Sequence, residues 1–103
     1  MVLRINQIEG SDSGTILRLE GRVVAEVAAV LEQECSELLR SWSEVSLDLA
    51  GVSFVDIAGL EVFRRLSRAG AEIRCPSGAV ASVLEGAGIR VTLEADRVDY
   101  GRL

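Results

Sequence analysis

The chain has 103 residues and a formal charge of −5, and all eleven of its basic residues are Arg because it contains neither Lys nor His. These absences exclude an imidazole general base, a Ser-His or Cys-His nucleophile pair, an imidazole metal ligand and a lysine Schiff base. The acidic balance argues against non-specific binding to nucleic acid or anionic lipid, so a protein or a small molecule is the expected partner.

The length predicts a single domain over residues 1–103, which can bury a core without disulfide bonds. Cys35 and Cys75 lie in apolar patterns, which favours reduced core thiols over a disulfide framework. No metal-binding signature, membrane-length apolar run or signal peptide is visible in the sequence. We therefore expect a cytoplasmic domain with no metal, no cofactor and no direct membrane insertion.

The first half of the chain predicts a hairpin followed by a helix. Residues 2–8 alternate loosely, the polar cluster at residues 9–14 predicts a turn, and Leu17 and Leu19 lie on one face of a strand over Thr15–Glu20 that Gly21 ends. From Ala25 to Arg40 the apolar residues change to the three- or four-residue spacing of a helix that is docked on one side.

The second half alternates strands and helices. A strand over residues 45–49 runs into a loop at residues 50–56, and the next helix carries Leu60, Phe63 and Leu66 inward before Gly70 ends it. A strand over residues 71–75 follows. Pro76-Ser77 then opens a third helix, which has apolar residues at 80, 83, 84 and 87 and ends at Gly88. Residues 91–93 predict a short last strand, and residues 94–103 are a tail or a short terminal element.

This order predicts an α/β fold in which an N-terminal β-hairpin is followed by βαβαβαβ units around a mixed, mostly parallel sheet, with its core at about residues 3–93. Because such crossovers are right-handed, the carboxyl ends of the parallel strands should lie at one edge of the sheet. That edge would bring together Gly21-Arg22, residues 52–58 and Pro76-Ser77. It is where we expect the functional residues to lie.

Three features of the sequence invite a chemical interpretation. Asp56 precedes the second helix, where it would serve as a structural N-cap, and a catalytic role would need a proton partner that the chain lacks. Gly86-Ala87-Gly88 lies at a helix end, so it is not a dinucleotide-binding loop. Arg64, Arg65 and Arg68 have no aromatic neighbours and are typical of a solvated helix face rather than a nucleic-acid surface.

The run from Leu47 to Leu60, LDLAGVSFVDIAGL, resembles the signature of the STAS family, which is named for sulfate transporters and anti-sigma factor antagonists. Three further segments agree in order: Leu19–Val23, Arg68–Glu72 and Val83–Ile89. The resemblance covers about residues 3–93 and implies the STAS fold with a non-catalytic regulatory function. In bacterial members of the family, a stand-alone domain docks on an anti-sigma factor or serine kinase and is released when a serine at the start of the second helix is phosphorylated.

On this chain the phosphoacceptor position is Ala58, and its neighbour Ile57 stands where the family often has Ser or Thr. Neither side chain can accept a phosphate, so we expect a domain that is not switched at this site. Ile57 is either an exposed anchor for a partner or a residue buried under the Gly21 loop. The predicted partner-binding residues are Arg22, Asp56, Ile57, Ala58, Gly59, Leu60, Glu61 and Arg65.

Two kinds of partner remain open. One is an anti-sigma factor or serine kinase-like ATPase. The other is the ATPase of an ABC-type lipid transport system, since the family includes small STAS subunits of such systems that often carry Asp-x-Ala-Gly in this loop, as Asp56-Ile57-Ala58-Gly59 does. Pairing through the first strand would also give a homodimer. An enzymatic function is not expected.

Overall fold

The computed structural model describes residues 3–9, 14–75 and 78–93. Three parts of the predicted layout lie outside them: the turn at residues 10–13, the Pro76-Ser77 helix start and the segment 94–103. The elements follow the predicted order, namely β1 (Leu3–Glu9), β2 (Gly14–Val23), α1 (Ala25–Ser41), β3 (Glu44–Val55), α2 (Ile57–Arg68), β4 (Glu72–Cys75), α3 (Ala79–Gly86) and β5 (Thr92–Leu93).

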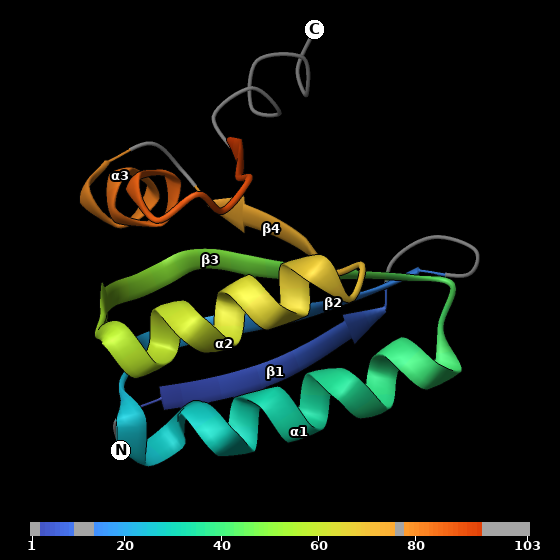
Figure 1. The fold of residues 1–103 in the computed structure, drawn as a ribbon. Coiled ribbons are helices and arrows are strands. Elements are labelled where there is room, and N and C mark those ends of the chain that lie inside the picture. The colour runs from blue at the N-terminus through green and yellow to red at the C-terminus, as the bar shows by residue number, and fades with distance from the viewer. Residues whose placement is uncertain (1–2, 10–13, 76–77, 94–103) are drawn as a thin grey trace, which may run out of the picture.

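The strands form one sheet in the order β1-β2-β3-β4-β5. β1 pairs with β2 antiparallel and the other three pairs are parallel, which confirms the predicted mixed sheet. α1 and α2 lie side by side along one face of the sheet, as Figure 1 shows, and α3 packs against β3. β1 is an edge strand of the described sheet, which is where pairing with a second copy would occur, and that homodimer stays a prediction.

Strand periodicity separates the core from the opposite face of the sheet. Before the register shifts of β2 and β3, odd-numbered residues point toward α1 and α2, and Leu19, Leu47 and Ile73 are almost completely buried there together with Phe63 of α2. Cys35 and Cys75 are reduced and buried, as predicted. Burial raises the pKa of the Cys35 thiol to about 11, so this group stays protonated and is a poor nucleophile.

Two predicted boundaries are wrong. Gly21 does not end the second strand, and residues 50–55 are strand rather than loop, because β2 and β3 continue to pair as far as Val23 and Val55. The register shifts between Arg18 and Glu20 and again between Gly21 and Arg22. Gly21 accommodates the irregularity with a φ of 115°, a conformation that glycine adopts at little cost.

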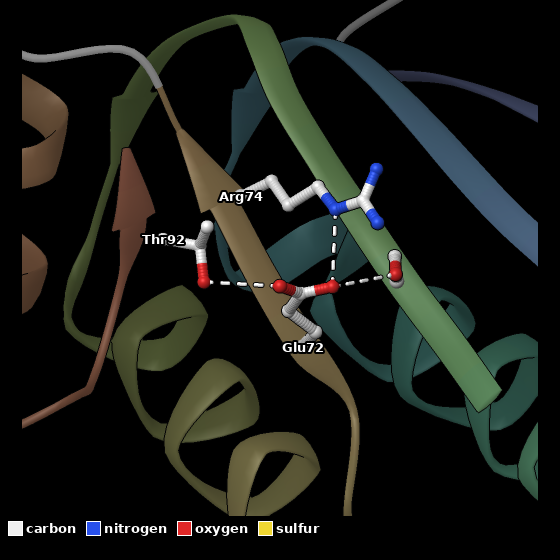
Figure 2. A network of polar contacts seen from close by, with 4 residues as sticks. Glu72, Arg74 and Thr92 are labelled. Atoms are coloured by element: carbon white, nitrogen blue, oxygen red, sulfur yellow. Dashed lines mark hydrogen bonds and ion pairs between the residues drawn. The ribbon is translucent and has the colours of Figure 1, made fainter. Parts of the chain in front are cut away.

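A polar network crosses the face of the sheet that points away from α1 and α2. The Glu72 carboxylate accepts hydrogen bonds from Arg74 Nε at 3.0 Å and Thr92 Oγ1 at 3.0 Å, as Figure 2 shows, and from Ser46 Oγ at 3.0 Å. These contacts join β3, β4 and the two-residue β5 through one side chain. Burial acts to raise the pKa of Glu72, but the three hydrogen bonds outweigh it and hold that pKa below its ordinary value.

The Glu72 network should make stability depend on pH. We expect Glu72→Gln to lower the free energy of unfolding by about 1 kcal/mol near pH 7, since the network is partly exposed. The pKa is lower in the folded chain than in the unfolded one. The contribution of the carboxylate is therefore complete above the ordinary value of 4.5 and is lost as the pH falls through the folded value. Urea unfolding at several pH values would show that the difference in the free energy of unfolding between the wild-type protein and Glu72→Gln becomes smaller in acid. A difference that stayed constant would contradict this account.

Candidate functional site

The carboxyl ends of β2 and β3 meet at one edge of the sheet, as predicted. Val23 pairs with Val55, and the backbone N–H of Asp56 donates to the Val23 carbonyl at 3.1 Å. The N-termini of α1 and α2 begin immediately after these strands, at Ala25 and Ile57. This edge therefore presents two helix starts beside each other.

Asp56 joins the two helix starts. Its Oδ1 accepts a hydrogen bond from the N–H of Gly59 at 2.9 Å, and its Oδ2 accepts one from the N–H of Ala25 at 3.0 Å. Val24, the N-cap residue of α1, provides no side-chain cap of its own. One carboxylate thus satisfies free N–H groups on both helices and lies near the positive ends of both helix dipoles. The predicted N-cap role for α2 is confirmed, and the contact with α1 is additional.

Gly59 is buried and allows α2 to lie close to β2. A Cβ atom at this position would lie 2.5 Å from the Val23 carbonyl oxygen and 2.9 Å from Cγ1 of Val55. Real Cβ atoms essentially never approach other atoms so closely. Gly59 therefore sets the distance between helix and sheet, and it is not itself available to a partner.

Ile57 is the exposed tip of this edge. Its side chain is 78% exposed, which excludes the buried alternative, and its role as an anchor for a partner stays a prediction. It is the first residue of α2 and follows the clamped Asp56 directly, so its position is held by the two helix starts. The next residue, Ala58, is half-buried against the core and carries no hydroxyl group.

The other predicted residues occupy different surroundings. Arg22 is exposed on β2, next to Phe54 in the strand register, and Leu60 is half-buried. Glu61 pairs with Arg64, whose Nη2 also donates to the carbonyl of Ala87 after α3 at 2.8 Å. The structure thus brings Arg22 and residues 56–60 to one edge, while Glu61 is tied to its own helix.

Arg65 lies about two turns along α2 from the tip and faces α1. Its Nε and Nη2 donate to the two carboxylate oxygens of Glu32 at 2.7 and 2.9 Å. These hydrogen bonds hold the pKa of Glu32 below its ordinary value. Arg65 and Arg68 are exposed, as expected for a solvated helix face, whereas Arg64 is half-buried and bonded to the Ala87 carbonyl.

Sequence reasoning missed two apolar residues at the edge. Phe54 is 51% exposed and Val83 of α3 is 46% exposed. Phe54 was hidden in a segment interpreted as loop, and Val83 shares the helical spacing of core residues. In the part of the chain that the structure describes, the fourth exposed large apolar residue is Val30 on α1, at 53%.

The described residues show neither a group of three potential metal ligands nor a helix with the length and apolar character needed to cross a bilayer. A family model described as "Mlab, STAS domain" matches residues 6–95. The chain belongs to the STAS family. Because the STAS match spans nearly the whole described part of the chain, it includes the edge at Arg22 and residues 56–60 and all three helices. A search of curated protein sequences found no significant match.

Solved structures share this STAS fold. An anti-sigma factor antagonist from Mycobacterium paratuberculosis has a TM-score of 0.77 at 17% identity, over 98% of this chain and 95% of that one. Unphosphorylated SpoIIAA, an anti-sigma factor antagonist and Bacillus cell fate determinant, gives 0.72 at 15% identity over 96% of each chain. The murine anion transporter Slc26a9 gives 0.60 at 19% identity, over 87% of this chain and 18% of the transporter. Identities this low show the shared fold alone.

Proposed function

We propose that this STAS domain is a non-catalytic regulatory module that binds a protein partner through the accessible residues of this edge, which are Arg22, Asp56, Ile57, Ala58 and Leu60. The observation that carries the proposal is the exposure of Ile57 on a clamped helix start. A branched apolar side chain held this rigidly loses little entropy on binding and serves well as an interface anchor. The similarity to anti-sigma factor antagonists supports a role of this kind, and we place its action in the cytoplasm.

The chemistry of the edge supports binding without a phosphate switch. Phosphorylation adds nearly two negative charges, and at position 58 the chain has a methyl group in place of a hydroxyl. The Asp56 carboxylate is occupied by two backbone N–H groups, and its role is to position the tip rather than to transfer protons. We therefore infer a domain whose affinity for its partner is not changed by modification at Ala58.

The partner that we favour is an anti-sigma factor or serine kinase-like ATPase, because solved anti-sigma factor antagonists share this fold. The second candidate is the ATPase of an ABC-type lipid transport system. It is supported by the Asp56-Ile57-Ala58-Gly59 loop, and the family model that matches is the one described as Mlab. The two candidates use the same edge and differ in the protein that it contacts.

Affinity capture from the native cell tests the proposal. We expect the wild-type chain to retain an ATPase, and Ile57→Glu to lose it by at least about 30-fold, because a charge would replace an interface anchor. Val30→Glu is the control, since it changes another exposed branched residue, on α1, and should retain the partner. Circular dichroism should show that both variants fold.

The identity of the captured ATPase discriminates the two candidates. A kinase-like ATPase supports the anti-sigma factor assignment, and a transporter ATPase supports the alternative. Retention of the same partner by Ile57→Glu would show that the tip at Ile57 is not the docking site.

A further inference from the structure

A second apolar feature lies at the same edge, beside the tip but separate from it. A shallow cavity of about 110 Å³ opens between the end of β3 and helix α3. We call it the β3–α3 groove, and its lining residues are Ser53, Phe54, Val55, Ala79, Val80 and Val83. Cavities of similar size, about 150 Å³, can hold a benzene molecule, so the groove is large enough to receive part of an apolar side chain.

The irregular pairing of β2 and β3 accounts for one wall of the groove. Val52 pairs with Gly21 and Phe54 pairs with Arg22, which leaves Ser53 as an extra residue that has no paired residue on β2 in the strand register. Such a bulge redirects the following side chains. Phe54 is half exposed, while Val55 packs against the core.

Helix α3 provides the other wall. Val80 and Val83 are three residues apart and therefore lie on the same side of the helix. Ala81 and Leu84 are the fully buried residues of α3, and Val80 is half-buried against the core. Val83 is exposed and is thus additional to the core-facing surface of α3.

A positive charge flanks the groove. Arg22 is exposed and lies opposite Phe54 in the parallel register, so the two side chains are neighbours on the same side of the sheet. Arg22 makes no ion pair with residues 3–9, 14–75 or 78–93. Helix α3 has no acidic residue in its first turn that could neutralise it. The groove therefore combines an apolar surface with one guanidinium group that is available to a carboxylate.

We propose that the β3–α3 groove binds a segment of the protein partner that carries a large apolar side chain next to an Asp or Glu. This proposal rests on the proposed function and names the chemistry of the partner. The apolar side chain lies between Phe54 and Val83, and the carboxylate pairs with Arg22. Burial of the three groups together strengthens the ion pair, because water is removed around it.

Two other occupants fit less well. The groove is open and polar groups do not converge in it, whereas small-molecule sites enclose their ligand and orient it with a few polar groups. In a two-fold dimer centred on the groove, both Arg22 side chains would meet at one contact, between chains that each carry a charge of −5. A partner with an acidic and apolar segment avoids both difficulties.

Selection of displayed random 12-residue peptides on the purified full chain tests the proposal. We expect the wild-type protein to enrich peptides in which a Leu, Ile, Met or Phe stands within two positions of an Asp or Glu. Arg22→Glu should shift the enriched residue to Lys or Arg. Val83→Glu should weaken binding of the wild-type peptides by at least about tenfold, and Val30→Glu should leave it unchanged.

Several results would overturn the inference. They are the absence of enrichment, enrichment without an acidic residue, peptide binding that Val83→Glu does not affect, and a concentration-dependent dimer that Val83→Glu dissociates. Native capture separates the two proposals. If Ile57→Glu loses the ATPase and Val83→Glu keeps it, the tip is the docking site and the groove is not; if both variants keep it, both proposals are wrong.

Discussion

Replacing Asp56 with Ala is expected to lower the free energy of unfolding by about 2–3 kcal/mol. Each side-chain cap contributes about 1 kcal/mol, and this carboxylate caps two helices. The loss should exceed that of an ordinary N-cap substitution, because α1 has no other side-chain cap. Urea unfolding followed by far-ultraviolet circular dichroism measures the difference.

Asp56→Asn separates the two contacts. Asn is a good N-cap and keeps one acceptor oxygen, but its amide NH₂ group is a donor and cannot accept the second N–H. We therefore expect a loss about half as large as that of Asp56→Ala. If Asp56→Ala cost less than about 0.5 kcal/mol, the carboxylate would not join the two helices in solution.

The consequence for binding follows from the same geometry. Ile57 comes directly after Asp56, so loosening either helix start changes where the tip lies. At temperatures where Asp56→Ala is still folded, its partner affinity should fall more than that of Asp56→Asn. Stability and docking are coupled at this edge because one side chain serves both.

The sequence was sufficient for the element order and for the edge at which the strands end. Hydrophobic periodicity separates strands from helices, and the handedness of crossovers determines which loops lie together. The same pattern misplaced the ends of β2 and β3, because a bulge breaks the two-residue alternation on which strand prediction depends. Glycine at position 21 was interpreted as a stop, whereas it accommodates an irregular pairing.

The candidate site was predictable only in part, for a similar reason. The position of Asp56 before a helix indicates one cap, but its contact with Ala25 spans 31 residues and depends on how two strands pair. The apolar spacing of α3 does not show which of Val83 and Leu84 faces the core. The resemblance located the tip, and the packing of α3 against β3 was needed to reveal the groove.

Gly59 is the position where one methyl group should have the largest effect. In Gly59→Ala the new Cβ would lie 2.5 Å from the Val23 carbonyl oxygen, which is backbone and is itself held by the N–H of Asp56. Either α2 moves away from the sheet or the bond between Val23 and Asp56 breaks. We expect a loss of about 2–4 kcal/mol in the free energy of unfolding, from overpacking together with one lost hydrogen bond.

Gly86→Ala is the matched control for this substitution. Gly86 is the last residue of α3, and a Cβ there would meet no atom within 4 Å. Both substitutions remove glycine from a helix and restrict the unfolded chain alike, so Gly86→Ala should stabilise the domain by up to about 1 kcal/mol. Urea unfolding measures the change in the free energy of unfolding for each variant. A loss in Gly59→Ala together with a gain in Gly86→Ala would show that the close approach of α2 to β2 causes the loss. A neutral Gly59→Ala would mean that the helix start lies farther from the sheet and that the clamp at Asp56 is looser than its 2.9 and 3.0 Å contacts indicate.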